Sequence, residues 1–240
     1  MPVYVYAIAP TSHPLHLDGM TGVGEPAEEL SLVTEGDLAA VVSDAPEGLR
    51  AKRRDVLAHQ EVLAGLQEQG GVLPLRFGAL APDTDAVRSA LGERAGAYQE
   101  RLAALDGCAE YHLKASCEED VLLRDVLTES EDARRMNEEI RGGHGGQQLK
   151  MALGELVSAE VTARREALGS AVVSALRPLA RELRMSDAAG DDFVSVSFLV
   201  ERARQSAFLE RHGEIAAEYG DEFSFRLHGP LPPYSFVEGE

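Results

Sequence analysis

The sequence contains no tryptophan and only two cysteines, and aromatic residues make up 5% of its 240 residues. With so few large rings, the hydrophobic core must be built mainly from Leu, Val and Ala. The spacing of Cys108 and Cys117 matches no zinc motif, and two thiols without an export signal predict a reducing cytoplasm. We therefore expect both cysteines to be plain core or surface thiols.

Basic residues are few relative to acidic ones. The 23 Lys and Arg residues stand against 41 Asp and Glu residues, which gives a net charge of −18 at pH 7. This charge repels phosphate backbones and anionic lipid, and it favours solubility. The densest basic cluster, Arg50, Lys52, Arg53 and Arg54, is followed by Asp55 and is too small for a nucleic-acid footprint. We therefore expect no nucleic-acid partner and no membrane partner.

Long hydrophobic runs are also missing from the sequence. No segment approaches the roughly 18 apolar residues that a membrane span requires. The first residues, MPVYVYAIAP, lack a basic region before an apolar stretch, so they predict an immediate strand and no signal peptide. These features predict a cytoplasmic location.

The first half of the chain, residues 1–105, is predicted to form an N-terminal α+β domain. The expected elements are strands at residues 3–8, 30–34 and 38–44, a helix at 53–69, a strand at 72–77 and a helix at 84–105. The turn residues 35–37 predict a hairpin between the second and third strands. Pro74 marks the strand at 72–77 as an edge or bulge strand, because proline has no N–H to donate.

The second half, residues 106–240, is predicted to form a second α+β domain with a Pro-rich tail at residues 229–240. The expected elements are a strand at residues 109–117, helices at 118–140 and 147–185, a strand at 193–201, a helix at 203–219 and a strand at 222–228. Pro178 is expected to kink or split the long helix. This order predicts a modified ferredoxin-like sheet, with one strand missing or replaced and the helices packed on one face.

Three segments resemble the gas vesicle protein F/L (GvpF/GvpL) family, in the order in which that family carries them. They are MPVYVYAIA with Tyr4 and Tyr6, HQEVLAGLQEQGGVLPLRFG from residue 59 to 78, and GPLPPYSFV from residue 229 to 237. The segments CAEYHLKAS at residues 108–116 and FVSVSFLVERA at 193–203 are also similar to strands of the family. The PLRFG element and the GPLPPYSF end are together quite specific, and the resemblance spans nearly the whole chain.

The resemblance implies a cytoplasmic accessory or minor structural protein of the gas vesicle. Such a protein supports vesicle assembly by binding the hydrophobic shell protein and other vesicle proteins, and it has no enzyme activity and no cofactor. The resemblance also implies two α+β domains, of which the second is a modified ferredoxin-like one. RGGHGG, at residues 141–146, falls where family members vary, so the resemblance gives it no role.

The residues that we expect to contact a partner, or to lie between the domains, are on predicted sheet edges and in the tail. They are Arg76, Phe77, Phe223, Phe225, Pro232, Pro233 and Tyr234. A sheet edge can receive a strand from an apolar partner and so cover it. For Arg76, the alternatives are a partner-facing or domain-bridging cation and, favoured here, an ion pair with a carboxylate of the neighbouring helix. For the tail, they are a polyproline ligand and, favoured here, an ordered segment packed through Tyr234 and Phe236.

No pattern in the sequence predicts a catalytic, metal or cofactor site. His59 and Glu61 are two residues apart on a predicted helix, so they do not face each other. His13, His16 and Asp18 share a loop without the geometry of a metal site. The main alternative function is a small-molecule-binding or regulatory α+β protein, because ferredoxin-like sheets host many activities.

Overall fold

The computed structural model describes residues 1–237, which fall into two compact units. Unit 1 comprises Met1–Tyr111, Leu199–Arg202 and the described residues from Gly229 onwards. Unit 2 comprises His112–Phe198 and Ala203–His228. The α+β class expected from the sequence is confirmed, whereas the division into domains 1–105 and 106–240 stays a prediction.

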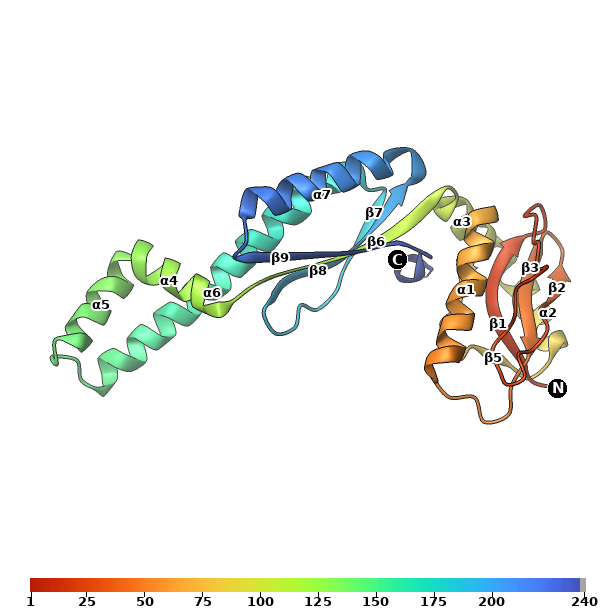
Figure 1. The fold of residues 1–240 in the computed structure, drawn as a ribbon, viewed down its shortest axis with the longest axis horizontal. Helices are drawn as coiled ribbons and strands as arrows, with labels where there is room; N and C mark the ends of the chain where they lie inside the picture. Colours follow the sequence, from red (N-terminus) through yellow and green to blue (C-terminus); the bar gives the residue numbers. More distant parts are fainter. Residues whose placement is uncertain (238–240) are drawn as a thin grey trace. The chain divides into compact units, whose positions relative to one another are not determined.

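Unit 1 is built on an antiparallel sheet around a central first strand (Figure 1). Its strands are β1 (Val3–Pro10), β2 (Ser31–Glu35), β3 (Leu38–Asp44), β4 (Leu73–Pro74) and β5 (Leu80–Ala81). The order is β2-β3-β1-β4, and β5 also pairs with β1. The pairing of β1 with β3 shifts register between Val5 and Ala7, so Tyr6 and Ala7 both face the same core.

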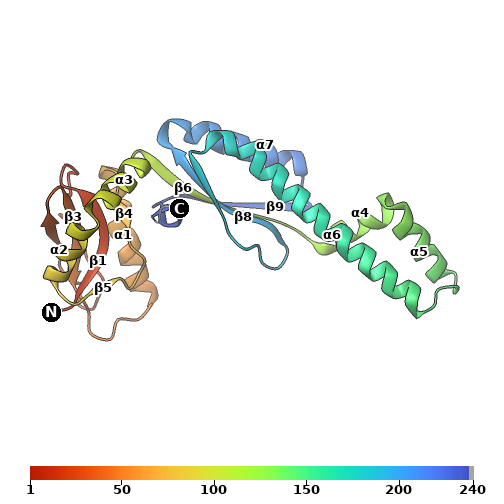
Figure 2. The same cartoon turned by 180° about the vertical axis from the view of Figure 1, so that it is seen from behind.

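Helices cover both faces of this sheet, as Figure 2 shows from behind. They are α1 (Arg53–Gln69), α2 (Thr84–Glu93) and α3 (Ala95–Leu105). On one face, Val62, Leu63 and Leu66 of α1 pack against the two tyrosines of β1. On the other, α2 and α3 pack their apolar sides against the opposite side chains of β1. Each fully buried aliphatic side chain stabilises the fold by about 1.5–3 kcal/mol, so β1 is fixed from both sides.

Two expectations for unit 1 are wrong in detail. The single helix predicted for residues 84–105 is two helices that meet at Arg94, a non-helical residue with φ −114° and ψ 17°. The strand predicted for residues 72–77 is limited to Leu73–Pro74. The chain then turns at Phe77 and Gly78, and this segment is held by a hydrogen bond from the Gly78 N–H to the Tyr4 hydroxyl and by one from His59 to the Leu75 carbonyl oxygen.

The second sheet has the strand order of a ferredoxin-like fold. Its strands are β6 (Cys108–Cys117), β7 (Glu182–Met185), β8 (Asp192–Glu201) and β9 (Phe223–Leu231). The order β7-β8-β6-β9 puts the first and third strands in the centre, and the crossover helices are α6 (Gln147–Leu176) and α7 (Gln205–Tyr219). Both views show α6 and α7 on the same side of this sheet (Figures 1 and 2).

The long helix is shorter than the sequence predicts, and this changes the sheet. α6 ends at Leu176, and the short 3-10 helix η1 (Arg177–Leu179) contains Pro178. Proline removes an N–H and clashes with the preceding turn, so the α-helix cannot continue. The residues that follow form β7. The expectation of a missing or replaced strand is therefore wrong, because β7 completes the four-stranded sheet.

Two further helices, α4 (Glu119–Glu129) and α5 (Glu131–Arg141), lie between β6 and α6 in the chain. The single helix predicted at residues 118–140 is wrong because Ser130 adopts an extended conformation and its hydroxyl accepts a hydrogen bond from the Ala133 N–H. Ser130 thus caps α5 and ends α4. Both helices pack beside α6, in the part of the molecule drawn in green in Figure 1. Within residues 1–237, no helix has the length and apolar character of a membrane span.

Candidate partner-binding surfaces

The tail packs onto unit 1 through two aromatic residues. Phe236 has no exposed surface and lies in the core formed by the sheet, α2 and α3. Tyr234 packs against the opposite core, beside the tyrosines of β1. Burial, with a smaller contribution from Glu110, raises the pKa of Tyr234 to about 12. Of the two interpretations of the tail, the structure agrees with the ordered segment over residues 229–237.

Polar contacts also hold the tail in place. Glu110 is 4% exposed, and its carboxylate accepts two hydrogen bonds from Ser235, at 2.9 Å from the backbone N–H and 2.6 Å from the hydroxyl. The guanidinium of Arg101 donates a hydrogen bond from Nε to the carbonyl oxygen of Phe236. A buried carboxylate is costly unless it is hydrogen-bonded, so Glu110 and Ser235 stabilise the packed tail together. Pro233 is buried and Pro232 is half-buried in the same segment.

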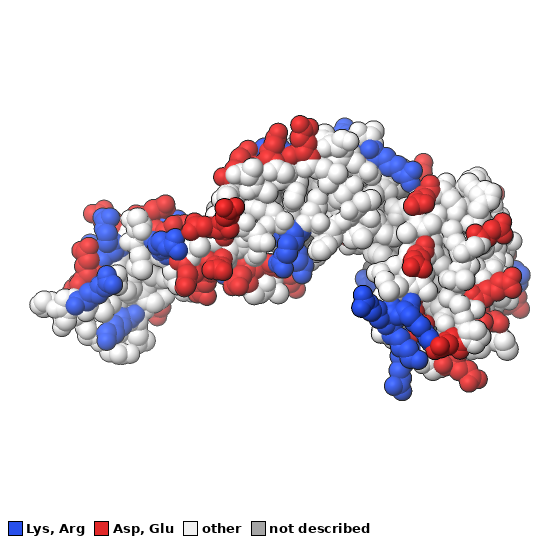
Figure 3. Space-filling view, in the orientation of Figure 1, with Lys and Arg blue, Asp and Glu red and all other residues white. Residues whose placement is uncertain are grey.

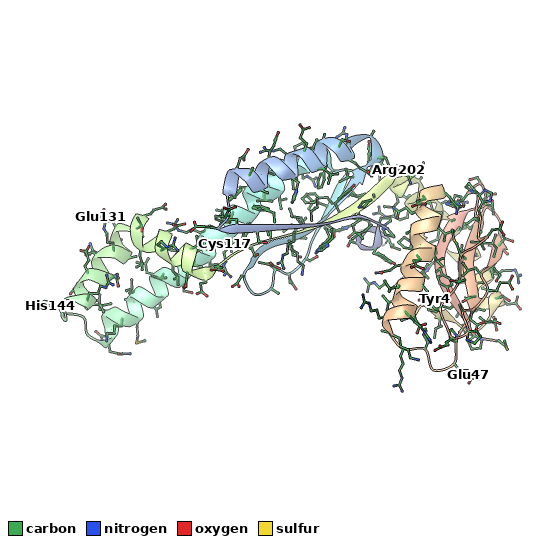
Figure 4. All side chains as sticks on the ribbon, in the orientation of Figure 1. Tyr4, Glu47, Cys117, Glu131, His144 and Arg202 are labelled. Atoms are coloured by element: carbon green, nitrogen blue, oxygen red, sulfur yellow. The ribbon has the colours of Figure 1, made fainter. Side chains whose placement is uncertain are left out.

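A hydrogen-bond chain links β1, α1 and the segment after β4. The His59 Nε2 atom lies 3.1 Å from the Leu75 carbonyl oxygen, which only accepts, so Nε2 carries the proton and Nδ1 is an acceptor. The Tyr4 hydroxyl therefore donates to Nδ1 across 2.9 Å, and it accepts from the Gly78 N–H at 3.1 Å. Burial lowers the pKa of His59 and raises the pKa of Tyr4, so both side chains are neutral near pH 7. Figure 4 labels Tyr4 between the sheet and α1.

Arg76 and Phe77, which lie within the segment held by this hydrogen-bond chain, differ in their environment. Phe77 makes edge contacts with the rings of Tyr4 and His59, at centroid distances of 5.9 and 5.8 Å. Arg76 is exposed, and no carboxylate among residues 1–237 forms an ion pair with it. The favoured expectation of an ion pair with the neighbouring helix is therefore wrong. Arg76 is a solvent-facing cation on a loop that is fixed on both sides.

Tyr6 makes a second set of polar contacts on the same face of the sheet. Its hydroxyl accepts a hydrogen bond of 2.8 Å from the Val23 N–H and lies 3.1 Å from the Ser43 hydroxyl. The ring of Tyr6 stacks on His59 at a centroid distance of 5.6 Å. The sequence contains a signal for this arrangement, because residues two apart in a strand point to the same face. The Tyr4-x-Tyr6 pair could thus have been placed opposite α1.

The aromatic residues of β9 belong to unit 2. Phe223 and Phe225 are half-buried and contact the ring of Phe193 edge-on, at centroid distances of 6.2 and 6.3 Å. Tyr219 of α7 also lies against both phenylalanines. The alternate residues of β9 are exposed, and Arg226 among them forms an ion pair with Asp192. Phe223 and Phe225 are thus positioned on the helix side of an edge strand.

The seven candidate residues therefore fall into two groups. Those of unit 1 are Arg76, Phe77, Pro232, Pro233 and Tyr234, and those of unit 2 are Phe223 and Phe225. In unit 1, Phe77 and Tyr234 pack against the same core cluster. Phe77 and Tyr234 are half-buried and Pro233 is buried, whereas Arg76 is exposed.

His13 and the two cysteines, for which the sequence predicts no metal role, lie in the interior of the described structure. His13 is buried, its Nε2 donates to the Leu66 carbonyl oxygen at 3.1 Å, and its Nδ1 accepts from the Leu15 N–H at 3.0 Å. Cys108 and Cys117 are both buried, and burial raises the pKa of the Cys117 thiol. In the described part of the chain, no group of three or more His, Cys, Asp or Glu residues could hold a metal ion.

Comparison with protein families gives a match over nearly the whole chain. The family model described as gas vesicle synthesis protein GvpL/GvpF matches residues 2–238. Gas vesicle protein F of Streptomyces sp. (strain CB03234) is 43% identical over 239 residues, which cover 99% of this chain and 100% of the relative. Gas vesicle protein L of the same strain is 28% identical, with 98% of this chain and 92% of the relative covered.

Two crystal structures share the fold. GvpF from Anabaena sp. PCC7120 has a TM-score of 0.87 at 21% identity, with 100% of this chain and 99% of that chain covered. GvpF from Microcystis aeruginosa has a TM-score of 0.81 at 23% identity, with 99% of both chains covered. At these identities the likeness shows the fold alone, and the family follows from the sequence matches. The chain belongs to the gas vesicle synthesis protein GvpL/GvpF family.

Proposed function

We propose that this protein supports gas vesicle assembly by binding the hydrophobic shell protein, and with it other vesicle proteins, through the free edge of β9. A wall protein that has not yet assembled exposes apolar surface and unpaired strand edges, and both promote aggregation. A protein with a free strand edge can pair with such a segment, so that the backbone N–H and C=O groups of the segment form hydrogen bonds. The proposed activity requires no catalytic step and no cofactor.

The observation that carries this proposal is the position and length of β9. β9 has nine residues, lies at the end of the order β7-β8-β6-β9, and pairs with β6 alone among the strands of the described chain. In an antiparallel pair, every second residue directs its N–H and C=O away from the partner strand. Pro230 has no N–H to donate, so the stretch that suits pairing is residues 223–229, in which about three or four residues present backbone groups to an added strand.

The other predicted edge supports strand addition less well. β4 pairs with β1 over only two residues, Leu73 and Pro74, and one of them has no N–H. The segment that follows is held by the His59 side chain and turns away. β9 is therefore the edge that we assign to the partner.

The side chains of β9 suit the addition of a strand that is apolar on the side of Phe223 and Phe225 and polar on the other side. Phe223 and Phe225 are half-buried on one side, so a neighbouring strand with apolar side chains can extend this cluster. Exposed polar residues, Arg226 among them, lie on the other side. The net charge of −18 keeps such a complex in solution and opposes self-association.

The test is capture of the purified shell protein by immobilised full-length chain and by two proline variants, Ser224→Pro and Phe225→Pro. Adjacent residues in a strand direct their N–H groups to opposite sides, so one variant removes an edge donor and the other breaks a bond to β6. The variant that removes the edge donor keeps the melting temperature within a few degrees and loses capture.

The matched control is Phe225→Val, which keeps the N–H and a β-branched apolar side chain and therefore retains capture. Capture equal to that of the wild-type chain by both proline variants, with both folded, would contradict strand addition at β9. Absence of capture by the wild-type chain would contradict shell-protein binding itself.

A further inference from the structure

A cluster of cations lies at the start of α1, on a protein that is otherwise acidic. Four of the five residues from 50 to 54 are Lys or Arg, and all four are exposed. The rest of the sequence has 19 basic residues against 41 acidic ones, when these four are subtracted from the total of 23. Figure 3 shows Lys and Arg side chains gathered beside the lower end of α1, where that helix begins.

One of the four cations is neutralised within the fold. The Arg54 guanidinium forms an ion pair with Glu25, and its Nε lies 3.3 Å from the carboxylate of Asp55. Asp55 is buried and also accepts a hydrogen bond of 3.2 Å from the Gly24 N–H. These contacts fix the start of α1 to the loop that contains Gly24, so the neighbouring cations project from an anchored segment.

The other three cations, Arg50, Lys52 and Arg53, form what we call the basic patch. Within residues 1–237, no side chain forms an ion pair or a hydrogen bond with any of them. Salt bridges in the same unit include Arg88 with Asp85, three residues away on a helix. Three adjacent unpaired cations are therefore not explained by a shortage of acidic residues in this chain.

The basic patch also works against the stability of α1. Lys52 is the residue that caps the helix, and Arg53 is its first residue. The start of a helix carries partial positive charge, so cations there destabilise it, and a Lys side chain cannot accept a hydrogen bond from the free N–H groups. A side chain chosen for stability would be Ser, Thr or Asp. Where a local rule is broken in this way, a functional cause is expected.

We propose that the basic patch binds a short acidic segment of a partner protein, with carboxylates of the partner paired to Arg50, Lys52 and Arg53. Three cations suit a segment with a few neighbouring carboxylates. The contacts of Arg54 and Asp55 already fix the backbone that carries these cations, so less conformational entropy is lost when the segment binds. A carboxylate there also interacts favourably with the start of α1. The partner class is therefore a protein with an exposed acidic run.

The surroundings of the basic patch favour a protein over nucleic acid. A hollow of about 230 Å³ beside it is lined by Glu25, Glu28 and Glu47 as well as by Arg50 and Lys52. A nucleic-acid strand would place successive phosphates against these glutamates, whereas a short segment can end before it meets them. Screening at physiological salt acts over about 8 Å, so the patch attracts a partner locally although the whole chain repels polyanions.

The inference is independent of strand addition at β9, because the basic patch lies in unit 1 and residues 223–228 of β9 lie in unit 2. Each variant can be tested both for capture of the shell protein and for binding of an acidic peptide. Loss of strand addition at β9 affects the first measurement, and loss of the basic patch affects the second.

The experiment measures binding of a fluorescein-labelled hexaglutamate peptide to the full-length chain by fluorescence anisotropy. The patch variant carries Arg50→Gln, Lys52→Gln and Arg53→Gln. The control variant carries Arg134→Gln, Arg141→Gln and Lys150→Gln, which removes three exposed cations from unit 2 and gives the same net charge. We expect the patch variant to bind about tenfold more weakly at about 50 mM salt, and the control variant to bind as the wild type does.

Stability measurements separate a binding defect from a folding defect. Because the patch variant removes cations from the start of a helix, its melting temperature is expected to equal or exceed that of the wild type. Equal affinity of the wild type and the patch variant for hexaglutamate would overturn the proposal. An equal loss of hexaglutamate affinity in the control variant would also overturn it. So would binding of a hexaglutamine peptide as tight as that of hexaglutamate, or tighter binding of a six-nucleotide oligothymidylate.

Discussion

Packing of the tail against unit 1 makes a quantitative prediction for Phe236. This side chain has no exposed surface and lies in the core with residues of β1, α2 and α3. Truncation of a buried Phe to Ala removes its hydrophobic transfer energy and leaves a cavity, which together cost about 3–5 kcal/mol. Domains are stabilised by only about 5–15 kcal/mol, so Phe236→Ala should remove a large fraction of the stability of unit 1.

The assay has to report on unit 1 alone, because two units need not unfold together. Hydrogen exchange followed by mass spectrometry provides this, since protection of amides in α1 and β1 reports the free energy of opening of that unit. The predicted result for Phe236→Ala is a large loss of protection in both elements. Leu231→Ala is the matched control, because Leu231 is 37% exposed near the start of the tail and its truncation should cost under about 0.5 kcal/mol.

The polar contacts of the tail give a second variant for the same assay. Ser235→Ala removes the hydroxyl that donates to Glu110 at 2.6 Å but keeps the backbone N–H that donates at 2.9 Å. A lost hydrogen bond to a buried charged group costs about 1.5–3 kcal/mol, so the effect should be smaller than that of Phe236→Ala. Protection equal to that of the Leu231→Ala control in both tail variants would refute the tail as a structural part of unit 1.

Three further predictions concern buried polar groups. Tyr4→Phe leaves the Gly78 N–H and the His59 Nδ1 without a partner, so it should lower the free energy of unfolding by about 1–3 kcal/mol in urea titrations; an unchanged value would show that the hydroxyl is not needed. Burial lowers the pKa of His59 in the folded chain below the value of about 6.5 in the unfolded chain. The contribution of neutral His59 to stability is therefore fully present above about pH 6.5, and it is lost as the pH falls through the lower pKa of the folded chain. The stability of wild type relative to His59→Asn should shrink over that acidic range, and a difference independent of pH would contradict it. Cys108 and Cys117 are buried, so Ellman's reagent should react with both thiols only in denaturant; rapid reaction in buffer would contradict their burial.

Sequence patterns located most elements because their apolar spacing agrees with their final environment. The helix predicted at residues 53–69 is α1 with the same limits, since Val62, Leu63 and Leu66 face a sheet and Gly70 follows the last turn. The hairpin at residues 35–37 and the strand at 193–201 were located in the same way. In each case, local propensity and burial favour the same structure.

The errors arose where local pattern and tertiary context disagree. Leu179 and Leu183 continue the apolar spacing of α6, so periodicity alone extended the helix across Pro178. Pairing with β8 then makes a strand of residues 182–185, and such pairing cannot be read from a window of sequence. Ser130 was a readable signal, because serine before two acidic residues is typical of a helix start.

The segments that hold the candidate residues could be predicted from the sequence, but the different environments of adjacent residues within a segment could not. The resemblance drew attention to Arg76 and Phe77 together, yet one is exposed and the other lies against Tyr4 and His59. This difference depends on a tautomer and on hydrogen bonds between residues up to 74 positions apart. Neither spacing nor composition encodes such contacts.

Residue-mapped crosslinking is the most direct test of the proposal that the shell protein binds the free edge of β9. A photoreactive residue is placed in turn at exposed positions 224, 226 and 228 of β9 and, as a control, at exposed position 32 of β2 at an edge of the first sheet. We expect crosslinks to the purified shell protein from the β9 positions and none from β2. Crosslinks from β2 with none from β9 would contradict it.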